Sequence, residues 1–149
     1  MRKIFYVLLS LSTLLFVGCN RNTEIPVPEL NVSANNSEIS VSRGGYEWTN
    51  NVGFSNKETV TADSASPEQI ADTMSGNKVK PQSELILSFS EQPKKVKIIT
   101  WGESKDNKYT YDNDKLIVPQ EKGTYIYEVF GEWTQGHVSY TIKIIVTNE

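Results

Sequence analysis

Two runs of alternating apolar and polar residues, 123–133 and 138–146, dominate the C-terminal part of the chain. A period of two is typical of β-strands that bury one face, and the intervening Thr134-Gln135-Gly136 is typical of a turn. The pattern therefore predicts a long hairpin with one buried face. The residues that share this face are Tyr125, Tyr127, Val129, Gly131, Trp133, Val138, Tyr140, Ile142, Ile144 and Val146.

Shorter runs predict further strands near residues 38–42, 45–49, 57–62, 84–89, 94–101 and 115–118. Turn-forming residues separate several of them, at Gly44-Gly45, Asn50-Asn51 and Asp112-Asn113-Asp114. In the run 94–101, Trp101 is out of phase with Val96 and Ile98. Either both faces of this strand are buried, or a bulge shifts its register.

One short helix is expected between these strands, from about residue 67 to residue 75. Ser66 can act as the N-cap, Pro67 suits the first helical position, and Gln69 completes a capping box. Gly76 ends the apolar stripe of this segment. Strands with a single short helix predict an all-β fold.

The N-terminus has the pattern of a secretion signal. Arg2 and Lys3 precede an apolar run that ends at the chain's only cysteine, Cys19. Residues Leu15 and Val17-Gly18-Cys19 resemble the lipobox of bacterial lipoprotein precursors, which implies cleavage after residue 18 and attachment of lipid, such as palmitate, to Cys19. An uncleaved anchor is the alternative, but the apolar run of about 14 residues is shorter than the roughly 20 that a membrane-spanning helix needs. A plain secretory signal with an accidental cysteine is the other alternative.

Composition divides the remainder into a linker and one domain. Residues 19–37 are rich in Asn, Ser, Thr and Pro, which predicts a flexible linker from the lipidated Cys19. Residues 38–149 are then expected to form the β-sandwich domain. Loss of residues 1–18 removes two basic side chains, so the formal net charge changes from −3 to −5. A nucleic-acid partner is not expected, because a phosphate-binding face needs clustered basic residues.

Part of the domain, about residues 79–147, resembles an immunoglobulin-like sandwich, which implies that the domain is an antiparallel β-sandwich. The residues that carry the resemblance are Leu87, Trp101, Tyr125 and Tyr127. In that family a Trp on strand C packs against a disulfide, and a Tyr two residues before the second Cys forms a hydrogen-bonded corner. The resemblance implies that Leu87 and Tyr127 replace the cysteines, that Trp101 is buried against Tyr127, and that Tyr125 forms the corner. The chain is also similar to lipoproteins of Gram-positive bacilli.

No pattern of catalytic residues is present. His137 is the only histidine, and lipidation of Cys19 would leave no thiol, so neither a zinc site nor a cysteine nucleophile is expected. Phosphate-binding loops and the common hydrolase motifs are missing from the sequence. The chain is therefore expected to be a non-enzyme without a cofactor.

Two functions fit these features. One is a binding or interaction module that is lipid-anchored on the extracytoplasmic face of the cell membrane. The alternative is an accessory lipoprotein that regulates or inhibits a membrane sensor or enzyme. A protein or cell-wall partner is expected at the hairpin end, through Trp133, Gln135 and His137, unless Trp133 closes the core instead. Tyr46 and Trp48 are either the buried side of a hairpin or a carbohydrate-stacking pair.

Overall fold

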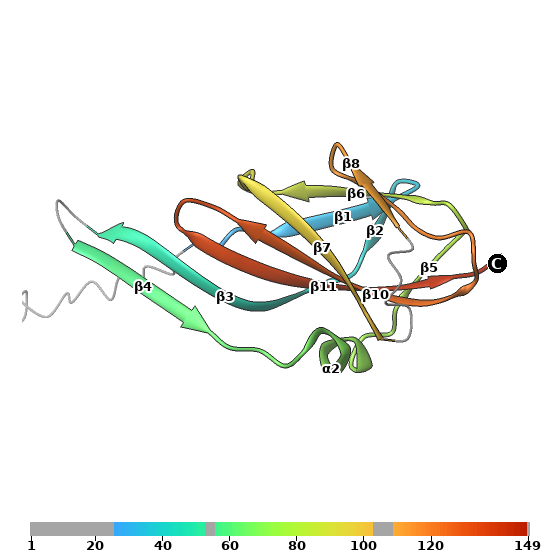
Figure 1. Cartoon of the computed structure of the whole chain (residues 1–149), viewed down its shortest axis with the longest axis horizontal. Coiled ribbons are helices and arrows are strands. Elements are labelled where there is room, and N and C mark those ends of the chain that lie inside the picture. Colours follow the sequence, from blue (N-terminus) through green and yellow to red (C-terminus); the bar gives the residue numbers. More distant parts are fainter. Residues whose placement is uncertain (1–25, 53–55, 103–108, 149) are drawn as a thin grey trace, which may run out of the picture.

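The computed structural model describes residues 26–52, 56–102 and 109–148, which form two facing sheets and one short helix (Figure 1). The first sheet has five strands in the order β2 (Ser37–Ile39), β1 (Leu30–Ala34), β6 (Glu84–Phe89), β9 (Lys115–Ile117) and β8 (Thr110–Asp112). The second has the order β4 (Asn56–Ala62), β3 (Val41–Val52), β11 (Gly136–Val146), β10 (Gly123–Glu132) and β7 (Lys95–Trp101). Strand β5 (Asn77–Val79) joins this sheet by pairing in parallel with β11.

The predicted all-β sandwich is therefore the fold of the chain, and its strand order matches a constant-type immunoglobulin domain. Such domains pair strands A, B, E and D in one sheet and C, F and G in the other. Here β1, β6, β9 and β8 take the first set of positions, while β7, β10 and β11 take the second. Strands β2 to β5 and the helix are inserted between the strands that correspond to A and B.

The long C-terminal hairpin is confirmed, although Thr141 of its outer row is also fully buried. Strands β10 and β11 pair without interruption from Gly123↔Val146 to Glu132↔His137. Every predicted inner-face side chain of the two strands lies in the core, where Tyr127 and Ile142 are fully buried. Burial raises the pKa of the Tyr127 hydroxyl, which has no hydrogen-bond partner among the described residues. The phenol is therefore neutral at physiological pH.

The helix α2 (Pro67–Asp72) begins as predicted. The Ser66 hydroxyl accepts from the Gln69 amide N–H, and the Gln69 side chain accepts from the Ser66 amide N–H, which completes the capping box. At the other end the Lys143 ammonium donates to the carbonyls of Ala71 and Met74, at 2.8 and 3.0 Å. A cation at the end of a helix where the carbonyls lack partners is favourable. These contacts fix α2 on the outer face of the second sheet.

The predicted boundaries were wrong within β3. Asn50 and Asn51 do not form a turn but pair with Glu58 and Lys57, so the β3–β4 hairpin is longer than expected. Gly44-Gly45 does not separate two strands either. These two glycines lie inside β3, opposite the single residue Ser139 of β11, and form a β-bulge there.

The predicted linker was also wrong in its second half. Residues Leu30–Ala34 form β1, whose Leu30, Val32 and Ala34 side chains are buried. Asn35 and Asn36 have φ angles of 49° and 62° and form the tight turn into β2. Paired positive φ angles are typical of type I′ hairpin turns, which Asn tolerates. The domain therefore begins well before residue 38.

Trp101 does not pack between the sheets as the immunoglobulin resemblance implied. Strand β7 pairs with β10 in regular register, which places Trp101 opposite Ile126, on the face away from the core. Its indole N–H donates to the Glu128 carboxylate at 2.9 Å. Ile98 faces the core instead, and Tyr127 packs against Tyr109 and Tyr125.

The tyrosine corner, by contrast, is confirmed. Tyr125 lies near the start of β10, and its hydroxyl donates to the Glu121 carbonyl at 2.9 Å. This bond runs back to the backbone four residues upstream, as in immunoglobulin-type sandwiches. It holds the loop before β10 against the end of the core.

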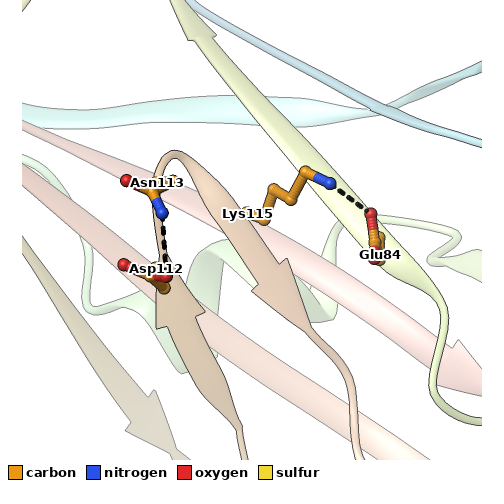
Figure 2. Close-up of polar contacts among 4 residues, drawn as sticks. All are labelled: Glu84, Asp112, Asn113 and Lys115. Carbon is orange, nitrogen blue, oxygen red and sulfur yellow. Dashed lines mark hydrogen bonds and ion pairs between the residues drawn. The ribbon is translucent and has the colours of Figure 1, made fainter.

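The predicted turn at residues 112–114 joins β8 to β9 and places this small hairpin on the edge of β6. Figure 2 shows the Asn113 side-chain amide donating to Asp112 at 2.8 Å, and the Lys115 ammonium 2.9 Å from the Glu84 carboxylate. Both partners of this ion pair are about half exposed, at 50% and 52%. Such exposed pairs contribute about 0–1 kcal/mol, so the hairpin is held mainly by the burial of Leu116.

Candidate functional site

Trp133 is not available to a partner. Its side chain is 8% exposed and packs edge-to-face against Trp48 and Phe89, with ring centroids 5.6 and 5.8 Å apart. Its indole N–H donates to the Glu91 carbonyl at 2.9 Å. A Cβ atom at Gly131 would overlap the Trp133 ring, so glycine lets the indole lie over β10. The alternative that Trp133 closes the core is therefore correct, and its proposed role as a contact residue is wrong.

Trp48 is a core residue as well. It is 1% exposed, which removes the carbohydrate-stacking alternative for this side chain. Tyr46 is partly buried against the same core and carries the Arg43 guanidinium 5.5 Å from its ring centroid. The alternative that this pair forms the buried side of a hairpin is therefore correct for Trp48, whereas Tyr46 is only partly buried.

Gln135 lies at the turn between β10 and β11, where the backbone is tied down on two sides. The Trp133 amide donates to the Gly136 carbonyl at 2.8 Å, and the Thr49 amide of β3 donates to the Gln135 carbonyl at 2.9 Å. The Gln135 side chain donates to Glu91 at 3.3 Å. The turn is therefore a small supported loop, as the sequence predicted, with Gln135 half-buried.

His137 lies on the outer face of the second sheet, away from Trp133. Its ring stacks on Phe130 with centroids 5.1 Å apart and planes 28° apart. Across the ladder it pairs with Glu47 of β3. Both His137 and Phe130 line a surface cavity of about 310 Å³, which is the candidate functional site. The structure thus separates the three predicted contact residues and brings only His137 to this cavity.

The floor of the cavity is the sheet, and its wall is the segment that follows β4. Gly45, Glu47, Glu128 and Ser139 contribute to the floor, and residues 62–65 with Pro67 and Ile70 form the wall. The bulge at Gly44-Gly45 bends β3 at this point, and α2 continues the wall onto β10 and β11. The inserted part of the chain therefore creates the concave surface on an otherwise flat sheet.

Carboxylates dominate the charge of the cavity. Glu47, Asp63 and Glu128 line it, and its lining contains neither Lys nor Arg. Glu128 is held by two donors, the Ser139 hydroxyl at 2.7 Å and the Trp101 indole at 2.9 Å. The cavity is therefore suited to binding groups that donate hydrogen bonds or carry positive charge beside an aromatic ring.

Sequence reasoning missed Glu47, Glu128, Phe130 and Ser139. The alternation that predicted the inner row of the hairpin also places residues 128, 130, 137 and 139 together on its outer row, so this signal was available. The contribution of residues 62–70 to the cavity could not be predicted from the sequence, because it depends on where the helix packs against the sheet. Cys19, the proposed lipidation site, lies outside the described residues.

Among the described residues, no group of three or more His, Cys, Asp or Glu side chains is arranged to hold a metal ion. The described part of the chain also has no helix with the length and apolar character needed to cross a bilayer. No protein-family model matches the chain, and no curated protein or solved structure shows significant similarity to it.

Proposed function

We propose that this chain is an extracytoplasmic lipoprotein, anchored to the cell membrane through Cys19, whose β-sandwich is a non-enzymatic interaction module. The signal-like segment that ends at Val17-Gly18-Cys19 supports the anchor. The cavity on the outer face of the second sheet carries the interaction part of the proposal. It gathers side chains that the core does not use on the rigid support of β3, β10 and β11.

The cavity favours a protein partner over a stacked carbohydrate. The rings of Phe130 and His137 stack on each other, and Trp48 of the proposed carbohydrate-stacking pair is buried. Tyr46 of that pair lines the cavity but packs against the core. Three carboxylates instead offer pairing to basic or hydrogen-bond-donating side chains. An interaction of this kind gives specificity through charge complementarity.

A double variant tests the interaction. In mild detergent, the full chain extracted from bacterial membranes should elute with a partner, at a larger size than the isolated protein. Glu47→Ala with His137→Ala should abolish that complex, because both side chains line the cavity. Their partial exposure predicts a change in the free energy of unfolding of less than about 1 kcal/mol.

The control is Lys122→Ala, an exposed substitution just before β10, at the opposite end of that strand from its turn. It should leave the complex intact. A wild-type chain that elutes alone, or a double variant that keeps the complex with unchanged stability, would show that the cavity is not the contact surface.

A further inference from the structure

The chain enters the sandwich at a defined end. The Pro28 carbonyl accepts from the buried Tyr140 hydroxyl at 2.7 Å, and Glu29 exchanges hydrogen bonds with Ser90 in both directions. Ser90 begins the loop that follows β6, and the next residue, Glu91, accepts from Trp133 and Gln135. Residues 26–29 therefore lie beside the turn between β10 and β11.

The shortened tether limits how the domain can be oriented. Because the structure assigns residues 30–34 to β1 and holds Pro28 in place, only residues 20–25 separate Cys19 from Pro26, where the described domain begins. The seven Cα–Cα steps from Cys19 to Pro26 span at most about 25 Å when the chain is fully extended. The ten residues of β10 alone cover about 33 Å from this turn to the opposite end. A tether of this length does not reach past the opposite end.

The β3–β4 hairpin projects from the same end. Strand β11 stops pairing with β3 at Gly136↔Trp48, while β3 and β4 remain paired out to Val52↔Asn56 (Figure 1). A two-stranded ribbon thus extends beyond the turn, formed by residues 49–52 and 56–59. No strand of the described chain pairs with the outer edge of β4. An unpaired edge offers backbone donors and acceptors to an extended segment of another chain.

The charges at this end fit a protein partner and not a lipid surface. Anionic headgroups attract clusters of four or more Lys and Arg residues. Here the charges are mixed in sign, with Lys57, Lys94 and Lys95 beside Glu58, Glu91 and Glu132. Lys57, Glu58 and Thr59 are exposed along the free strand.

We infer that this ribbon faces the membrane and that the partner of the cavity, whose lining includes Thr61 and Ala62 of β4, also pairs along the free edge of β4. That partner is an extended extracytoplasmic segment of an integral membrane protein. The inference rests on the proposed anchoring at Cys19. It also selects between the two functions that the sequence left open, because a domain that presents its binding ribbon to the bilayer is suited to an accessory role on a membrane protein.

The orientation is tested by energy transfer from the domain to acceptor lipids. Lys57→Cys and Lys122→Cys place single donor dyes at opposite ends of the full-length, lipidated protein in phosphatidylcholine vesicles, because the sulfur of Cys19 is blocked by lipid. Both lysines are exposed, so the variants are matched. Transfer should be strong from position 57 and weak from position 122. Equal transfer or the reverse order, in protein that floats with the vesicles, would overturn the orientation while the anchor stands.

The partner is tested by a photoactivated crosslinker at the same two positions in intact cells. The expected result is an adduct from position 57 only, whose crosslinked peptide maps to an extracytoplasmic segment of an integral membrane protein. An adduct to lipid, to a second copy of this chain, or from both positions alike would overturn the inference. Failure of the protein to float with vesicles would instead refute the proposed anchoring, and the inference with it.

Discussion

Replacing Trp48 by alanine should lower the free energy of unfolding by about 3–5 kcal/mol, the range for truncating a large buried aromatic side chain. Trp48 is 1% exposed and packs edge-to-face on Trp133 at one end of the core. Its removal leaves a cavity next to Trp133, whose ring also packs on Phe89 in the same aromatic cluster. Urea unfolding of the soluble Cys19→Ser protein, followed by fluorescence, measures the loss.

Trp101→Ala is the matched control, because it removes the same side chain from the outer face of β7. It deletes the hydrogen bond to Glu128, and Ser139 still donates to that carboxylate, so a loss of about 1 kcal/mol is expected. Equal losses for the two variants, or a larger loss for Trp101→Ala, would contradict the phase of β7 described above.

Val32→Asp should destabilise the domain by about 4 kcal/mol or more, because it places a carboxylate in the core without a partner. Val32 is 2% exposed and lies between Ile39 of β2 and Leu87 of β6. The expected result is a protein that is largely unfolded at room temperature, measured by the loss of amide dispersion in NMR spectra.

Asn31→Asp adds the same charge one residue earlier, on the exposed face of β1. It should change the free energy of unfolding by less than about 0.5 kcal/mol. If both variants stayed equally stable, residues 30–34 would behave as the flexible linker that composition predicted. The tether between Cys19 and the folded domain would then include these residues and be longer.

The composition of residues 30–37 led to the wrong prediction of a flexible linker, because the polar residues there belong to a β-hairpin. Leu30, Val32 and Ala34 alternate with polar residues, as a half-buried strand requires. Asn35-Asn36 supplies the positive φ angles of the turn. The long β10–β11 hairpin was predictable because ten consecutive residue pairs repeat one alternating pattern. The five residues of β1 lie among Asn and Ser residues, so their alternation was a weak indication of a strand.

The position of Trp101 shows how a family resemblance can conflict with strand phase. Its spacing from Leu87 and Tyr127 matched the immunoglobulin order, but alternation from Ile98 places it on the opposite face. Phase decides, because side chains in a regular strand must alternate between the two faces. The position of Tyr125 agrees with both the immunoglobulin order and the phase of its strand, and its corner hydrogen bond is present.

The candidate site was only partly predictable for a different reason. Its floor comes from the outer row of one hairpin, which is local, but its wall comes from residues 62–70, which pack on β10 and β11. Lys143 fixes that wall through the end of α2, across 69 to 72 positions in the sequence. Periodicity does not report such long-range docking.

The central claim, a domain anchored through Cys19, is tested most directly by the mass of the protein isolated from bacterial membranes. We expect a chain that begins at Cys19 and carries the added mass of a lipid, and a Cys19→Ser chain that lacks this lipid and is either released from the membrane or left as an uncleaved precursor. A membrane-derived chain with an unmodified Cys19, whether residues 1–18 are retained or removed, would contradict it.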